Sequence, residues 1–391
     1  MLYKNHWPSE RKSHFILKFI NKAFIELPLP SNINYYWNLG SLLSFCLIIQ
    51  LITGILLAMH YCPEIIHSFD SIAHIERNIY SGHMLRNIHA NSASIFFLCV
   101  YLHISRNIYH ITWSNKITWS LGITIYLTMI ITAFVGYVLP WGQMSFWAAT
   151  VITNLFSAIP YIGNFVVLWI WGSFSVSNPT LNRFYSLHYL LPFILTSLII
   201  IHILALQTEH HTNPIGNQSE IDQIPFHQYF TTKDIQTIIL ISIVIFFITT
   251  TIPHTFSDPE NFIKANPLIT PTHIQPEWYF LFAYSILRSI PNKLGGIIAL
   301  ISSIIILYLI LLLKQNNIKT TNHRPNLKLT TWLLSITFIL LTWIGSKPAE
   351  PPYTTLSLII TAWYFTSFLI FIPLHSNKEN KIIYMHKTPL T

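Results

Sequence analysis

The chain has 391 residues, of which 52% are hydrophobic and only 9% are charged, and its formal net charge is +8. Because soluble domains usually carry about 25% charged residues, this composition excludes a soluble globular protein and indicates several membrane crossings. The three cysteines, Cys46, Cys62 and Cys99, form no CxxC motif, so we expect this chain to hold neither a zinc site nor an iron–sulfur cluster.

The first apolar pattern, near the N-terminus, is amphipathic. Phe15, Phe19 and Phe24 recur at helical spacing among charged residues. A helix of this kind lies on the membrane surface, with its apolar face in the lipid. We therefore expect a surface helix before the first span, and no cleavable secretory signal.

Eight later segments have the roughly 20 apolar residues that a membrane-spanning helix needs. We name them spans A to H. They are centred on residues 39–59, 88–108, 118–139, 184–206, 235–252, 295–313, 329–345 and 355–373. The predicted fold class is therefore all-α: a polytopic membrane protein with eight transmembrane helices. The polar tail from Ser376 onward is expected to fray.

Lysine and arginine gather on the side of the membrane that carries both termini, which predicts that both termini lie on the inner side. The longest connections, 140–182 and 253–294, then lie on the outer side. The first contains apolar stretches interrupted by Gly and Asn, which we expect to form short helices at the membrane surface. The second contains several proline turns around the motif Pro276-Glu277-Trp278-Tyr279.

Two of the spans carry a pair of histidines at the same interval. His89 and His103 in span B are fourteen residues apart, and so are His188 and His202 in span D. In an α-helix this interval rises about 21 Å in nearly four turns, so both imidazoles of a pair leave the helix on one face at two depths. Because a single span separates B from D, the two helices run in the same direction. The pattern therefore pairs His89 with His188 on the outer side, and His103 with His202 on the inner side.

Four neutral imidazoles on two facing helices make two bis-histidine sites. This ligation keeps haem iron six-coordinate and suits it to electron transfer rather than oxygen binding. A single histidine inside a membrane commonly hydrogen-bonds a neighbouring helix instead. The equal interval on both helices favours the metal interpretation, with one iron at each depth.

Glycines in spans A and C repeat the interval of the histidines. Glycine lets helices pack closely. Here each glycine predicts a gap in the side-chain layer beside an expected haem, where the flat group could approach the backbone. The four glycines are Gly40 and Gly54 in span A, and Gly122 and Gly136 in span C.

Two arginines stand at the membrane boundaries next to the histidines. Arg86 precedes His89 by three residues, and Arg106 follows His103 by three. Guanidinium groups pair strongly with carboxylates, so we expect both arginines to meet haem propionates. Arginines also occur at membrane boundaries without a ligand.

Several features point to one family: the four histidines, the four glycines, the stretches GYVLPWGQMSFWAATVITN and GSFSVSNPTLNRF, and the PEWY motif at Pro276. With these features the chain resembles the mitochondrial cytochrome b family, the central subunits of ubiquinol–cytochrome c reductase (complex III). The resemblance extends from about Ser31 to Pro373. It implies an N-terminal domain, 1–215, in which spans A to D form a four-helix bundle around two non-covalent haem b groups, and a C-terminal domain, 216–391. It also implies a multi-pass protein of the mitochondrial inner membrane, with both termini on the matrix side.

The resemblance implies partners as well: a Rieske iron–sulfur protein, cytochrome c1, further complex III subunits, lipids and a second copy of the chain, but no nucleic acid. Three alternatives differ in recognisable ways. A b6-type subunit has the PEWY motif on a separate chain and its span D histidines fifteen residues apart. A transmembrane ferric or oxygen reductase would need flavin and nicotinamide domains, and a haem-free transporter would show no b-type haem spectrum.

In the family, ubiquinol is oxidised in an outer pocket between the C–D helices and the E–F loop. The resemblance implies that Glu277 accepts a quinol proton there, with Tyr279 and Tyr284 as further catalytic residues. The residue chemistry agrees, because a carboxyl group in an apolar, proline-bounded loop is desolvated and poised for proton transfer. The implied residues of this outer quinone site are Phe134, Tyr137, Met144, Ala148, Ile152, Pro276 and Glu277.

Ubiquinone is reduced at an inner site in the family, and Lys233 and Asp234 match the Lys-Asp pair of that site. Gln207 stands where the family usually has histidine and cannot titrate, so we expect His210 or His211 to supply the proton. At the outer site, Ala148 stands where the family has glycine. Its methyl group is expected to weaken the binding of methoxyacrylate-type inhibitors while leaving quinol turnover normal.

Overall fold

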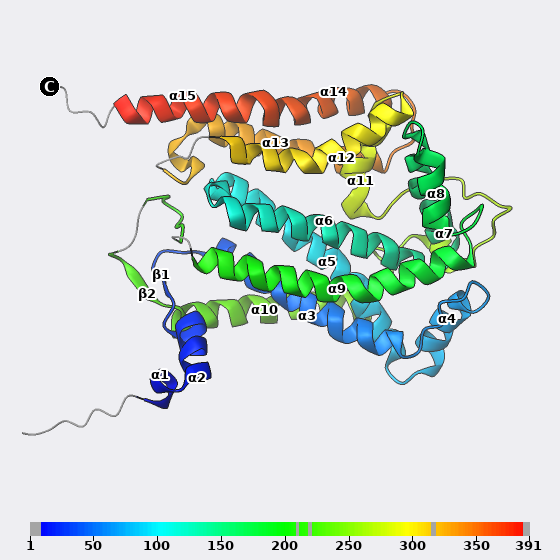
Figure 1. Cartoon of the computed structure of the whole chain (residues 1–391), viewed down its shortest axis with the longest axis horizontal. Coiled ribbons are helices and arrows are strands. Elements are labelled where there is room, and N and C mark those ends of the chain that lie inside the picture. Colours follow the sequence, from blue (N-terminus) through cyan, green and yellow to red (C-terminus); the bar gives the residue numbers. More distant parts are fainter. Residues whose placement is uncertain (1–8, 209–210, 218–220, 314–317, 386–391) are drawn as a thin grey trace, which may run out of the picture.

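The computed structural model describes residues 9–208, 211–217, 221–313 and 318–385. Eight helices within these residues are long and apolar enough to cross a membrane, which confirms the all-α fold class and the eight predicted spans. They run side by side along the long axis of the molecule (Figure 1). Because hydrocarbon offers no hydrogen-bond partner, helices suit this layer by satisfying their backbone groups internally. Sheet structure in the described part of the chain is one antiparallel pair, β1 (Pro28–Pro30) and β2 (Gln223–Pro225).

Four helices of the N-terminal half form a bundle. They are α3 (Leu39–Ala58), α5 (Gly82–Tyr109), α6 (Lys116–Val138) and α9 (Asn178–Gln207). Helix α3 packs along α5, and α6 packs along α9. An apolar core that includes Leu47, Phe97 and Met129 lies between them. Helix α10 (Phe226–Thr251) packs against α3 and α5.

The C-terminal half is arranged around a short helix, α11 (Leu281–Ser289). The sequence analysis assigns this segment to a connection, because nine residues are far too few for a span. In the structure, α11 is buried against three longer helices, and packing rather than length therefore stabilises it. The three longer helices are α12 (Lys293–Leu309), α13 (Pro325–Gly345) and α14 (Tyr353–Thr366).

The boundary between two domains near residue 215 remains a prediction.

Three short helices lie at one end of the bundle (Figure 1). They are α4 (Ser68–Asn78), α7 (Gln143–Asn154) and α8 (Gly163–Trp171). Gln143 connects α7 to the long loop after α10: its backbone N–H donates to the Ile263 carbonyl at 2.8 Å, and its side chain donates to the Ile269 carbonyl at 2.9 Å. The two long connections therefore form one layer over this end of the bundle.

The opposite end of the molecule carries α1 (Glu10–Ser13) and α2 (Phe15–Ile20), as well as the last turns of α15 (Ile372–Met385) (Figure 1). Phe15 is 86% exposed and Phe19 is 60% exposed. Such exposure of large apolar side chains fits a surface helix whose apolar face is covered by lipid. The side of the membrane on which this end lies remains a prediction.

The expectation that the tail frays from Ser376 is wrong, because α15 continues to Met385. Two side chains of this polar segment hold it against the start of α13. A carboxylate oxygen of Glu379 accepts from the Asn326 backbone N–H at 2.8 Å. The Asn380 side chain accepts from the buried Arg324 guanidinium at 2.8 Å. Hydrogen bonds to a neighbouring helix therefore order residues that are too polar to be predicted as part of a span.

Candidate functional site

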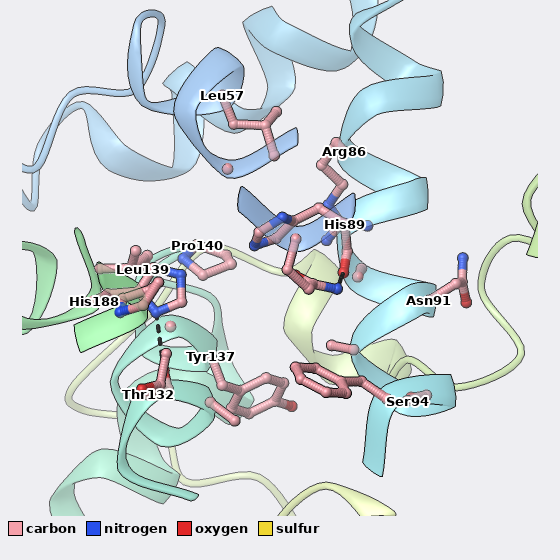
Figure 2. A pocket seen from close by; sticks show the side chains of 18 of the residues that line it. Leu57, Arg86, His89, Asn91, Ser94, Thr132, Tyr137, Leu139, Pro140 and His188 are labelled. Carbon is pink, nitrogen blue, oxygen red and sulfur yellow. Dashed lines mark hydrogen bonds between the residues drawn. The ribbon is translucent and has the colours of Figure 1, made fainter. Parts of the chain in front are cut away.

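The outer pair of histidines faces across the four-helix bundle. The imidazole rings of His89 on α5 and His188 on α9 have centroids 6.2 Å apart and planes 83° apart. A metal bonded to one nitrogen of each ring at about 2 Å keeps the centroids roughly 6 Å apart. Both rings border a cavity of about 280 Å³ between α3, α5, α6 and α9 (Figure 2). Their arrangement therefore fits a bis-histidine iron.

Hydrogen bonds hold both outer rings in the tautomer that a metal needs. The Thr53 hydroxyl donates to the Ile49 carbonyl at 2.6 Å, so its oxygen is left to accept from Nδ1 of His89 at 2.9 Å. Nδ1 of His188 donates to the Thr132 carbonyl at 2.9 Å (Figure 2). With the proton on Nδ1, Nε2 of each ring keeps its lone pair for a metal.

The inner pair, His103 and His202, lies on the same two helices, and the two rings are close enough to interact electrostatically. In the part of the chain that the structure describes, Nδ1 of each inner ring is buried without a hydrogen-bond partner. The Thr118 carbonyl lies next to His202 but outside hydrogen-bonding geometry. The inner rings are therefore less firmly oriented than the outer rings.

Each of the four predicted glycines faces one of the four histidines. A Cβ atom on Gly54 would lie 3.1 Å from Cε1 of His89, which is tighter than an ordinary contact. A Cβ atom on Gly136 would overlap the His188 ring, 2.6 Å from its Nδ1. Gly54 and Gly136 therefore make room for the imidazole rings themselves, whereas Gly40 and Gly122 face their rings at ordinary contact distances. The pairs are Gly40 with His103, Gly54 with His89, Gly122 with His202 and Gly136 with His188.

The two predicted arginines lie near the two ends of α5. Arg86 borders the cavity, and its Nε is 3.2 Å from a carboxylate oxygen of Glu76. Arg106 places its guanidinium 5.1 Å from the centroid of the Trp37 ring, and its Nε is buried without a hydrogen-bond partner among the described residues. A buried, unpaired guanidinium nitrogen near paired histidines fits the carboxylate of a bound cofactor. The contact with propionates remains a prediction.

A second, much smaller cavity of about 10 Å³ lies between the bundle and the outer loops. The structure brings six of the seven predicted outer-site residues together around it. Met144 is buried and does not border it. Phe280 borders it and was not predicted, although it directly follows the PEWY motif. The residues that line this cavity are Phe134, Tyr137, Ala148, Ile152, Pro276, Glu277 and Phe280.

Glu277 borders both cavities, and so does Tyr137. Burial, together with a smaller contribution from the negative charge of Asp258, raises the pKa of the Glu277 carboxyl group to about 7. A hydrogen bond from the Tyr137 hydroxyl and the positive charge of Arg86 act in the opposite direction but are outweighed. The carboxyl group can therefore both take up and release a proton near neutral pH.

The two predicted catalytic tyrosines lie in different surroundings. Tyr279 is buried and stacks on Phe97, with ring centroids 4.1 Å apart, and it borders the larger cavity. Tyr284 donates a hydrogen bond to the Ile274 carbonyl at 3.2 Å and lies under the Arg288 guanidinium. Neither tyrosine borders the small cavity. Their catalytic roles remain predictions.

Three of the predicted inner quinone residues, Gln207, Lys233 and Asp234, lie where α9 ends and α10 begins, and each is hydrogen-bonded to the segment that precedes or starts α3. His211 also has an interaction in the structure, whereas His210 lies outside the described residues. The polar groups of the site are thus close to the inner end of the bundle, and their role with quinone remains a prediction. The hydrogen bonds are Gln207 to the Ala23 carbonyl at 3.4 Å, Lys233 to the Ile33 carbonyl at 2.6 Å and Ser41 to the Asp234 carboxylate at 2.7 Å.

The fold and the site together define a multi-pass helical membrane protein with paired histidines at two depths. Two family models match the chain: Cytochrome b/b6/petB at residues 24–210 and Cytochrome b(C-terminal)/b6/petD at residues 264–365. A solved structure described as "Hyperthermophilic respiratory Complex III" contains a chain that is 32% identical, with a TM-score of 0.90. The match covers 95% of this chain and 98% of that chain.

This chain belongs to the cytochrome b family, as the sequence resemblance predicted. Membership implies that it binds haem b. It also supports a place in a membrane redox complex that oxidises quinol.

Replacing Gly136 by alanine is expected to remove the outer haem, because the new methyl group would overlap the His188 ring. Gly40→Ala is the matched control for the outer site, since Gly40 faces the inner ring of His103, where a Cβ atom would lie at an ordinary 4.0 Å, and it should leave the outer haem in place. The measurement is the outer haem step in a redox titration of the purified complex. An outer step retained in Gly136→Ala, or lost equally in both variants, would contradict this interpretation.

Replacing Ala148 by glycine is expected to strengthen inhibition by methoxyacrylate-type compounds. Ala148 is 4% exposed and borders a cavity with almost no free volume, so its methyl group excludes a ligand that needs this space. Removing the methyl should lower the inhibitory concentration roughly 10- to 100-fold, with quinol turnover changed by less than about twofold. Tight inhibition of the unmodified protein would show that the methyl group does not obstruct the pocket.

Proposed function

We propose that this chain is the cytochrome b subunit of a ubiquinol–cytochrome c reductase, with ubiquinol oxidised at the outer site and ubiquinone reduced at the inner site. The observation that carries the proposal is the pairing of His89 with His188, whose ring centroids are 6.2 Å apart. Hydrogen bonds at Nδ1 of both rings leave Nε2 to bind iron. The same two helices repeat the histidines fourteen residues further on. Two haem b groups at two depths follow from this repeat.

The haem ligands in this proposal are His89 and His188 for the outer group, and His103 and His202 for the inner group. When bound, the two groups supply one-electron transfer across the membrane, over the roughly 21 Å that fourteen helical residues rise. The chain's own contribution is to orient the imidazoles, keep water away from them and offer Arg86 and Arg106 to anionic groups.

At the outer site we assign the proton acceptor role to Glu277. It borders the small cavity, where a quinol hydroxyl would have to lie, and the larger cavity beside Arg86. A carboxylate in this position accepts a proton from quinol and can release it on the outer side of the protein, because its pKa is close to neutral pH. The Tyr137 hydroxyl donates a hydrogen bond that orients the carboxylate.

At the inner site we assign Asp234 and Lys233 to the binding and protonation of ubiquinone. Gln207 can donate a hydrogen bond but cannot carry the proton. Asp234 supplies a carboxyl group in this region, and Ser41 holds it by a 2.7 Å hydrogen bond. His211 is the second proton donor that we propose for this site.

The proposed location is the mitochondrial inner membrane, with both termini on the matrix side and with the Rieske protein, cytochrome c1 and a second copy of the chain as partners. Because the sequence has no cysteine cluster, we propose that another chain carries the iron–sulfur centre. The matched complex is named hyperthermophilic, so the mitochondrial location rests on the sequence resemblance. The PEWY motif on the same chain and the fourteen-residue interval in α9 favour the b type over the b6 type.

A redox titration of the purified complex is expected to show two haem b steps in the α-band of the reduced-minus-oxidised spectrum. Replacing His103 by alanine should remove one step and stop quinone reduction at the inner site, while the outer haem remains reducible. The reason is that the inner iron loses one of its two ligands. Two unchanged steps in the variant would overturn the ligand assignment, and a single step in the unmodified complex would overturn the proposed function.

Quinol oxidation is expected to speed up as the pH rises through about 7 and then to level off. Below this pKa the Glu277 carboxyl group is protonated and cannot accept a proton; above it the carboxylate predominates. Glu277→Gln should lower the rate about 100-fold and abolish the inflection. The measurement is the steady-state rate of quinol oxidation across this pH range, in the unmodified protein and in the variant. A variant with the same inflection would show that another group titrates.

A further inference from the structure

We propose that Thr53 lowers the reduction potential of the outer haem, through a hydrogen bond to its ligand His89 that the inner ligand His103 lacks. This inference rests on the proposed function, because it takes both histidines as iron ligands. Thr53 is a positioning residue, since its hydroxyl contacts the imidazole and acts on the iron only through that ring.

Helix α3 holds His89 with two hydrogen bonds from one of its faces. The Gln50 amide donates to the His89 backbone carbonyl at 2.8 Å, and also to the Ser92 hydroxyl at 2.7 Å. The Thr53 hydroxyl lies 2.9 Å from Nδ1 of the ring, and Gly54 leaves space at Cε1. Residues three and four apart share a helix face, so one turn of α3 holds both the backbone and the ring of this histidine.

The direction of the Thr53 hydrogen bond decides its chemical effect. A hydroxyl has one proton, and that of Thr53 goes to the Ile49 carbonyl at 2.6 Å. Thr53 therefore accepts from Nδ1–H of His89. A hydrogen bond of this kind makes the other ring nitrogen a stronger electron donor to a metal. A stronger donor stabilises the oxidised iron and lowers its reduction potential.

The inner site is built on the same repeat but lacks this group. Gly40 precedes Gly54 by fourteen residues and faces His103. The counterpart of Thr53 at the same interval is Leu39, whose side chain has no hydrogen-bond acceptor. Nδ1 of His103 accordingly has no partner in the described structure. The difference favours electron transfer from the outer to the inner haem.

The test is a redox titration of the haem b groups in the purified complex. We expect Thr53→Val to raise the potential of the outer haem alone, so that the equilibrium constant for electron transfer from the outer to the inner haem falls about tenfold, or about 59 mV for a one-electron couple. Thr53→Ser keeps the hydroxyl, so its equilibrium constant for this electron transfer should stay within about twofold of that of the unmodified protein. If the complex with Thr53→Val does not assemble, Thr53→Ala replaces it in the titration.

Thr249→Val is the matched control. Thr249 is buried in α10, and its hydroxyl has no hydrogen-bond partner among the described residues, so the same substitution there should leave both potentials unchanged. A Thr53→Val shift no larger than that of the control would overturn the proposal, as would an equal shift in Thr53→Ser. Loss of the outer haem from both Thr53→Val and Thr53→Ala would also overturn it, because Thr53 would then hold the haem rather than tune it.

The two proposals fail in different ways. If the unmodified complex shows fewer than two haem b steps, the proposed function is wrong, and the role of Thr53 falls with it. If both steps are present and the outer step does not move in Thr53→Val, only the role of Thr53 is wrong.

Discussion

The close contact between glycines and histidines is the constraint on which the N-terminal bundle depends. The imidazoles of α5 can turn toward α9 only if the backbone of α3 lies against them, and α6 must approach α9 in the same way. A side chain at any of the tighter positions, such as Gly54 or Gly136, would displace a ring. Because glycines and histidines share one interval, a glycine faces a histidine at both depths, tightly at the outer one and at the ordinary contact distances of 4.0 and 3.4 Å at the inner one.

Polar groups inside the apolar layer are costly unless they are paired. In this bundle, two of them orient rings: the Thr53 hydroxyl binds the His89 ring, and the Thr132 carbonyl binds the His188 ring. Gln50 binds the backbone carbonyl of His89. The inner rings receive less support from the described residues, and Arg106 nearby also keeps a buried nitrogen unpaired. The two ends of the bundle are thus alike in backbone arrangement and different in hydrogen bonding.

The two halves of the chain meet at Glu277, beneath the layer of outer loops. Gln143 binds the long loop to α7 through three hydrogen bonds, to Ile263, Asn266 and Ile269. This attachment encloses Glu277 between the bundle and the loop, beside Pro276 and Tyr137. Enclosure removes water from the carboxyl group and raises its pKa toward neutrality. The same packing that closes the end of the bundle therefore prepares a proton acceptor.

The sequence alone determined the class of the protein and the main lines of its site. Hydrophobic length predicted eight spans, and the helical repeat placed four histidines at two depths, because both properties are local and periodic. The sequence did not predict α11 or the ordered end of α15, since these short or polar segments are held by contacts with distant helices. Nor did it show that the glycines face the rings, or that Thr53 meets His89 where Leu39 leaves His103 unpaired. Those facts depend on how two helices are rotated against each other, which only packing in three dimensions decides.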